Sequence, residues 1–201
     1  QTSIVDVPVQ QIKNIPPLLG EVDVLKAIQL LPGVQSGGEG TSGFYVRGGG
    51  PDQNLILLDG VPVYNASHLF GFFSVFNADA IKNVRLTKGG FPARFGGRLS
   101  SVLEIDMKEG NMKTIEGEGS IGLISSKLTL QAPINKDKTS FIFSGRRTYI
   151  DLLAQPFIRR ANGGNPAGYY FYDLNTKLNH KLSKKDRFYI LSLIHISEPT
   201  R

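Results

Sequence analysis

The sequence predicts a small α+β domain with a short mixed sheet and small helices, followed by antiparallel strands of a truncated transmembrane β-barrel. Three observations support this prediction. Residues 1–110 switch between helical and strand periodicity and contain many glycine turns. Beyond Gly110, apolar and polar residues alternate, and short polar turns alternate with one long joint. We therefore expect one domain over 1–110 and barrel strands over 111–190.

Composition excludes several classes of function. The chain of 201 residues has no cysteine, so neither a disulfide framework nor a thiolate metal site is expected. Its three histidines are scattered, which argues against a metal enzyme. The net charge of +6 comes from residues 111–201, where basic residues are spread along strand-like segments and at turns. Nucleic-acid binding, which favours a basic helix face with interleaved aromatics, is not expected.

Membrane-spanning helices are not expected either, because the longest apolar stretches are far shorter than about 20 residues. The N-terminal residues 1–10 lack the basic start and apolar stretch of a signal peptide. We expect that any export signal lies upstream of these residues or was never present.

The chain begins with an apolar, β-branched segment, Ile4–Val9, which predicts an edge strand. From Glu21 the period changes to that of a helix. The residues predicted to share its apolar face are Val24, Leu25, Ile28 and Leu31. Pro32-Gly33 must end this helix, since proline cannot continue it.

Glycine-rich loops flank the next predicted strand, 44–47. They are SGGEGTSG at 36–43 and the glycines at 48–50. Neither contains the Gly-Lys-Ser/Thr ending or the G-x-G-x-x-G pattern of a phosphate-binding loop. We interpret these glycines as serving positive-φ turns and close backbone packing.

A buried strand at 54–58 then runs into Asp59-Gly60, which is a strong hairpin signal before the apolar run 61–64. Turn formation explains Asp59 better than catalysis does. Two further strands are expected at 84–88 and 102–106. The predicted core of the domain comprises Leu25, Ile28, Leu55, Leu57, Val84 and Val102.

The second half is predicted to consist of barrel strands. Residues 170–182 place apolar side chains on one face and polar ones on the other. Residues 139–149 behave alike, except that Ile142 falls on the polar face and Arg147 on the apolar face. A third strand is expected over 121–133, with its alternation broken at Leu123-Ile124 by a bulge or a change of face.

The joints between these strands differ in length. Asn135–Lys138 and Ser183–Asp186 are short polar turns, whereas the joint from Tyr149 to Tyr169 is long. This asymmetry is typical of outer-membrane barrels, with short periplasmic turns and longer outer loops. A soluble β-sandwich would give the same alternation with less regular turn asymmetry.

Four blocks in order carry a family resemblance. They are LPGV at 31–34, FYVRGGG at 44–50, QNLILLDGVPVYN at 53–65 and IKNVRLTKGGFPARFGGRLSSVLEI at 81–105. In order and spacing they resemble the plug domain of TonB-dependent receptors over roughly 20–108, and the variant is most similar to Bacteroidota-type receptors. The plug-motif residues, interpreted as structural or gating, are Arg47, Asp59, Gly60, Lys88, Gly89, Gly90, Arg94, Gly96, Gly97 and Arg98.

The resemblance implies a receptor in the outer membrane of a Gram-negative bacterium that takes up a siderophore, vitamin or oligosaccharide, with the plug gating the barrel. The implied partners are a TonB-type periplasmic energy-coupling protein, outer-membrane lipid, the substrate and a surface lipoprotein. No enzymatic activity is expected, because no nucleophile is accompanied by a base and an orienting group. No cofactor, metal or nucleic acid is expected either. The alternative is a soluble α/β binding or adhesion module without transport.

Two further expectations concern particular residues. Arg94 and Arg98 lie among glycines in the part of the plug that faces the barrel wall in the family, so we expect them to pair with barrel carboxylates rather than with substrate. Residues 191–201, LSLIHISEPTR, match codon for codon the translation of a transposase-adapter end used in sequencing libraries. We interpret them as non-native, expect the fourth strand to be cut after Ile190, and assign His195 and Glu198 no function.

Overall fold

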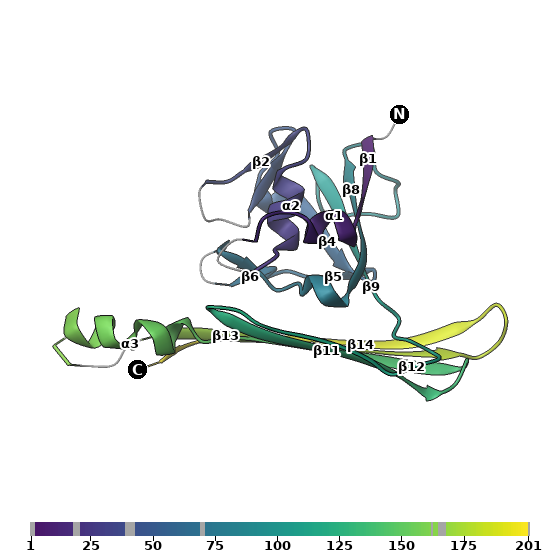
Figure 1. The fold of residues 1–201 in the computed structure, drawn as a ribbon. Helices are drawn as coiled ribbons and strands as arrows, with labels where there is room; N and C mark the ends of the chain where they lie inside the picture. The colour runs from purple at the N-terminus through teal and green to yellow at the C-terminus, as the bar shows by residue number, and fades with distance from the viewer. Residues whose placement is uncertain are drawn as a thin grey trace. The chain divides into compact units, whose positions relative to one another are not determined.

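A computed structural model describes residues 3–17, 21–38, 43–68, 71–161, 163–164 and 168–200 (Figure 1). The middle of the predicted loop at 36–43 therefore lies outside the described residues. By internal contacts the chain divides into two units. The first unit ends at Met107, and the second runs from Lys108 onward and includes Glu21.

The first unit is built on a five-stranded mixed sheet in the order β1-β8-β9-β4-β5. Its strands are β1 (Ser3–Pro8), β8 (Ile81–Lys88), β9 (Ser101–Met107), β4 (Asn54–Leu58) and β5 (Val61–Pro62). Only β4 and β9 pair in parallel, and the other pairs are antiparallel. The N-terminal segment is an edge strand, as predicted, because β1 pairs only with β8.

Short elements surround this sheet. They are helices α1 (Val9–Lys13) and α2 (Val24–Gln29), strands β2 (Val34–Ser36), β3 (Phe44–Val46), β6 (Ser67–His68) and β7 (Phe73–Ser74), and the 3-10 turns η1 (Pro51–Gln53) and η3 (Ala78–Ala80). Strand β2 pairs with β3, and β6 pairs with β7. The sequence prediction missed α1, which has only five residues.

Helix α2 shows how local sequence sets an element. Asp23 is its N-cap and accepts hydrogen bonds from the backbone N–H of Lys26 at 3.1 Å and of Ser74 at 2.6 Å. The helix ends before Pro32, and Gly33 takes φ 78°, a left-handed conformation that favours glycine. The predicted helix and its stop signal are therefore confirmed.

The predicted core is largely confirmed. Leu25, Ile28, Leu57, Val84 and Val102 are buried. Leu55 is only half-buried, although Leu57 on the same face of β4 is buried, because Leu55 lines a hollow beside Pro62. Alternation in a five-residue strand predicts which residues share a face, but not how completely each face is covered.

The second unit is an antiparallel sheet in the chain order β10-β11-β12-β13-β14. Its elements are β10 (Glu116–Ile121), β11 (Ser125–Asn135), β12 (Thr139–Thr148), α3 (Ile150–Ala161), β13 (Gly168–Lys181) and β14 (Arg187–Thr200). The two predicted short turns connect β11 to β12 and β13 to β14. Figure 1 shows α3 beyond the opposite end of the sheet from the β13–β14 turn.

One prediction for this unit was wrong, and one element was missed. Residues 121–133 are not one strand, because Leu123 and Ile124 lie in the turn between β10 and β11, where the Gly122 N–H donates to the Ser125 carbonyl at 2.8 Å. The long joint contains helix α3, which was not predicted. Strand β14 runs from Arg187 to Thr200 and pairs with β13 throughout. The interpretation of residues 191–201 as non-native stays a prediction.

Candidate functional site

Three of the sequence blocks meet at one corner of the first unit, around Lys88. The Lys88 side chain is buried, and its Nζ donates to the Pro32 carbonyl at 2.6 Å. The backbone N–H of Arg47 donates to the Gly33 carbonyl at 3.3 Å. The Arg47 guanidinium also lies 3.4 Å from where a Cβ at Gly89 would stand. These contacts link the end of α2, the turn after β3 and the end of β8.

Two of the predicted motif residues occupy tight turns with positive φ. Asp59 and Gly60 have φ 48° and 83° between β4 and β5, which confirms the hairpin. The Asp59 Oδ1 accepts from the Met107 N–H at 3.0 Å, and the Asp59 N–H donates to the Ile105 carbonyl at 2.9 Å. Asp59 therefore fastens the hairpin to the end of β9.

The turn after β3 has the same form. Arg47 and Gly48 have φ 50° and 85°, and Val46 and Gly49 on either side exchange backbone hydrogen bonds at 3.3 and 2.9 Å. Arg47 is exposed and lies in this turn rather than in the strand predicted over 44–47.

The sequence prediction missed a buried polar cluster that joins three strands. Asn54 donates to the Phe44 carbonyl at 2.7 Å and accepts from the Ser101 hydroxyl at 2.7 Å. Next to it, the Ser100 hydroxyl donates to the Val46 carbonyl at 2.7 Å. A Cβ at Gly49 would stand 2.4 Å from the Cβ of Ser100, so this position requires glycine. In the sequence, the glycines at 48–50 were the signal that could have indicated this close packing.

The remaining motif residues make local contacts. The Arg94 guanidinium lies 4.6 Å from the centre of the Phe95 ring, and Arg98 donates to the Gly97 carbonyl at 2.9 Å. Four glycines complete the connection: Gly89, Gly90 and Gly97 have positive φ, and Gly96 has open space around it. The structure therefore brings Arg47, Lys88 and Gly89 together, whereas Asp59 and Gly60 serve a separate turn.

Chemistry-bearing clusters are few. Across the ranges that the structure describes, no three His, Cys, Asp or Glu side chains come close enough to hold a metal ion. Within the same ranges, every helix falls short of the length and apolarity that a membrane span requires.

The sheet of the second unit has a buried polar face. The polar side chains buried along β12 and β13 are Ser140, Ser144, Arg146, Thr148, Asp173, Asn175, Lys177 and Asn179. Ile142 also lies on this face, as predicted. Arg146 of β12 connects the two strands there, because its Nε donates a hydrogen bond to Asp173 of β13 at 2.9 Å. The carboxylate of Glu21 lies 3.7 Å from the same guanidinium. Pairing of this kind is what a buried charge requires.

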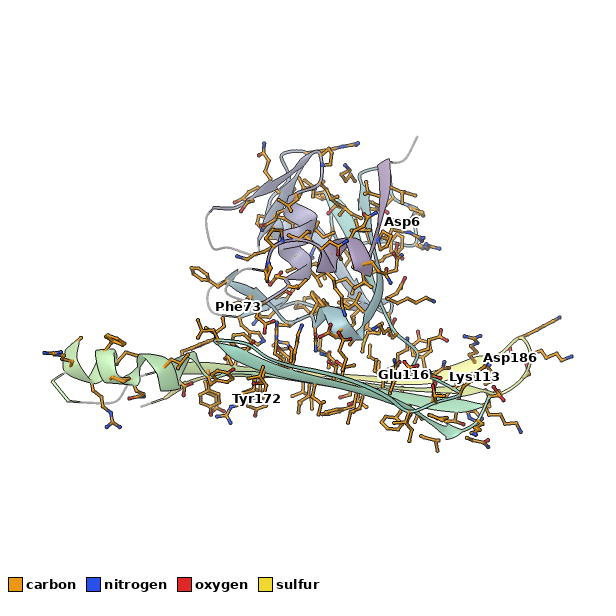
Figure 2. The ribbon with its side chains drawn as sticks, in the orientation of Figure 1. Asp6, Phe73, Lys113, Glu116, Tyr172 and Asp186 are labelled. Carbon is orange, nitrogen blue, oxygen red and sulfur yellow. The ribbon has the colours of Figure 1, made fainter. Side chains whose placement is uncertain are left out.

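The opposite face is apolar and solvent-accessible. Leu128 and Leu130 of β11 are exposed, and Phe143, Tyr172 and Leu174 are half-buried. Figure 2 shows Tyr172 projecting from the sheet. Arg147 falls on this face, as predicted, near the end of β12, with its guanidinium 5.6 Å from the centre of the Tyr170 ring. One face of these strands thus carries polar side chains and the other apolar ones, and apolar side chains are open to solvent, unlike in a water-soluble sheet.

Comparison with known sequence families gives a match over the first half of the chain. Residues 2–102 match the sequence family described as TonB-dependent Receptor Plug Domain. No curated protein sequence matches the chain significantly.

Solved structures of similar fold include two siderophore receptors and one outer membrane transporter. The siderophore receptor PirA from Acinetobacter baumannii is 19% identical with a TM-score of 0.70. The match covers 100% of this chain and 32% of the PirA chain. PirA from Pseudomonas aeruginosa is 17% identical with a TM-score of 0.68, with coverages of 100% and 35%. The outer membrane transporter YddB from Escherichia coli is 15% identical with a TM-score of 0.64, with coverages of 98% and 33%. The chain therefore spans about a third of the length of these neighbours.

Proposed function

Because the chain belongs to the family of TonB-dependent receptor plug domains, we propose that it is the plug and the first barrel strands of an outer-membrane receptor for energised nutrient uptake. The plug blocks the lumen of the barrel when the receptor is idle. A TonB-type periplasmic protein supplies the energy that opens a path. Transport of this kind needs no covalent chemistry.

One observation carries the proposal: strands β11, β12 and β13 have one polar face and one apolar face with solvent-accessible side chains. In a transmembrane barrel the outer face of each strand contacts lipid and the inner face lines a polar lumen. The buried polar face and the accessible apolar face of β11, β12 and β13 correspond to these two sides. Strands of 10 to 14 residues also suffice, since a tilted strand needs about 9–11 residues to span the bilayer.

The first unit supports the role of a plug. A wide barrel such as the 22-stranded transporters needs a lumen filled by a separate domain. The corner around Lys88 and the cluster around Asn54 fix the long connections between strands by buried hydrogen bonds. We assign the motif residues to shaping and gating this plug rather than to catalysis.

The substrate is proposed by class. PirA of both organisms is a siderophore receptor, and a siderophore is accordingly the first class to test for this chain. Vitamins and oligosaccharides follow. A surface lipoprotein is proposed as a further partner.

The test uses cells that express the full-length receptor containing this chain. We expect the receptor in the outer-membrane fraction and uptake of a radiolabelled siderophore, vitamin or oligosaccharide that a protonophore abolishes. Binding of the same substrate to isolated membranes should survive the protonophore, because only the transport step uses energy. Recovery of the protein in the soluble fraction, with binding and no uptake, would instead establish the soluble binding or adhesion module.

A further inference from the structure

A groove crosses the apolar face of the β10–β14 sheet. Its volume is about 690 Å³, within the range of about 300–1,000 Å³ that is typical of small-molecule sites. Gly119 and Gly145 form its floor, and both lie in one cross-strand row with Leu128 between them. Neither glycine contributes a side chain to the apolar face. The row is therefore hollow at Gly145, which has the side chains of Leu128 and Leu174 on its two sides.

One end of the groove carries a positive charge. Arg147 lines it from the next row, together with Tyr172. This arginine is exposed and lies one residue before the end of β12. The groove therefore combines an apolar trough with a cation at one end, where aromatic side chains accompany it.

The same end of the strands carries more basic and apolar side chains. Helix α3 begins two residues after β12 ends, and its last turn contains Arg159 and Arg160. Its Leu153 and Phe157, four residues apart and so on one side of the helix, are exposed. Exposed apolar side chains beside arginines are typical of helices at the boundary between lipid headgroups and acyl chains.

We propose that this groove binds one acyl chain of a phosphate-bearing membrane lipid, whose phosphate pairs with Arg147. The inference rests on the proposed function, because it requires the apolar face to contact lipid. An arginine on a lipid-facing surface is costly near mid-membrane and tolerated near the interface, where a phosphate can neutralise it. Since longer barrel loops are on the outer side, the long joint containing α3 places the site in the outer leaflet.

The glycines distinguish this site from nonspecific lipid contact. An added Cβ at Gly145 would lie 3.3 Å from the end of the Leu174 side chain, and one at Gly119 would lie 3.6 Å from the end of Leu128. A side chain at either position can be accommodated by flexible neighbours and would fill the trough. None of the residues that line the groove falls within 191–201, so the site does not depend on that segment.

The test is native mass spectrometry of the full-length receptor, released from nanodiscs that contain phosphatidic acid or diacylglycerol with the same acyl chains. We expect phosphatidic acid to be retained about tenfold more tightly than diacylglycerol, since about 1.4 kcal/mol corresponds to a factor of ten. Arg147→Gln should abolish this preference, and Lys136→Gln, an exposed cation in the short turn at the opposite strand end, should leave it unchanged. Inorganic phosphate at millimolar concentration should not displace the lipid.

Gly145→Leu tests the trough. It should weaken retention of both lipids, whereas Gly117→Leu, on the same face but outside the groove lining, should not. Folding of each variant is checked by the heat-dependent migration of the barrel on gels, and Gly119→Leu replaces Gly145→Leu if the latter fails to fold.

Equal retention of the two lipids by the unmodified receptor, or equal losses for Gly117→Leu and Gly145→Leu, would overturn the lipid site. If the receptor transports its substrate all the same, the proposed function stands without it. If the receptor is absent from the outer membrane, both proposals fail.

Discussion

Substitution of Gly49 by alanine should destabilise the first unit because of one backbone approach. The new Cβ would stand 2.4 Å from the Ser100 Cβ and 2.5 Å from its hydroxyl oxygen. Over-packing of this kind costs about 1–3 kcal/mol. If Ser100 moves away, its hydrogen bond to the Val46 carbonyl is lost, which costs about another 0.5–1.5 kcal/mol.

The size of the expected effect follows from these two contributions. The total is about 1.5–4.5 kcal/mol, and for a domain of about 100 residues each kcal/mol shifts Tm by roughly 4–8 °C. Thermal unfolding of residues 1–110, followed by circular dichroism, would therefore show a decrease in Tm of at least about 6 °C. Gly96→Ala is the matched control, because nothing lies within 4 Å of its added Cβ and its Tm should hardly change.

A second substitution separates the clash from other causes. Ser100→Gly removes the two nearest atoms that the alanine meets and leaves the Gln53 Oε1 at 2.9 Å, the end of a flexible side chain that can turn away. The Gly49→Ala/Ser100→Gly pair should therefore recover most of the loss caused by Gly49→Ala. Ser100→Ala keeps the Cβ and should recover little. A Gly49→Ala protein as stable as Gly96→Ala, or equal recovery by both Ser100 variants, would refute the reasoning.

Four other outcomes are expected. Lys88→Met should lower the free energy of unfolding of the first unit by about 1–3 kcal/mol in urea titrations, because the Pro32 carbonyl loses its buried donor, while Lys82→Met on the same strand should be neutral. Asp59→Ala should cost about 2 kcal/mol by the same measurement, and Asp59→Asn much less, since asparagine tolerates the positive φ. In the full-length receptor, Arg98→Ala should increase hydrogen exchange of the plug more than it weakens substrate binding, and unchanged exchange with lost affinity would reverse that assignment. Residues 1–110 should give more soluble protein than residues 1–201, because a partial barrel exposes an apolar face and open edges. A soluble, monomeric and cooperatively melting 1–201 would contradict this last expectation.

The features that sequence predicted are those set by neighbouring residues. Pro32-Gly33 ends a helix, and Asp59-Gly60 closes a hairpin, for reasons contained within a few positions. Alternation likewise gave the two faces of β13 and the exceptional positions of Ile142 and Arg147.

The features that sequence missed depend on distant parts of the chain or on weak local signals. The contact of Lys88 with Pro32 joins residues 56 positions apart, so no local pattern indicates it. Strand β10 consists of EGEGSI, whose glutamates and glycines are poor strand formers, and it is defined by pairing with β11. Helix α3 contains Pro156, which argues against a helix when the sequence is considered alone.

The edge position of β1 has a mechanical consequence. The strand is bonded to β8 alone, from Ser3 opposite Lys88 to Pro8 opposite Asn83. A force that draws the N-terminus away from the sheet loads these residue pairs one after another, so each step requires little work. Because β8 keeps β9 on its other side, the centre of the sheet is not strained while β1 detaches. The first residue pair to open is Ser3 with Lys88. Tension applied at the N-terminus therefore acts directly on the corner where the end of α2, the turn after β3 and the end of β8 are joined.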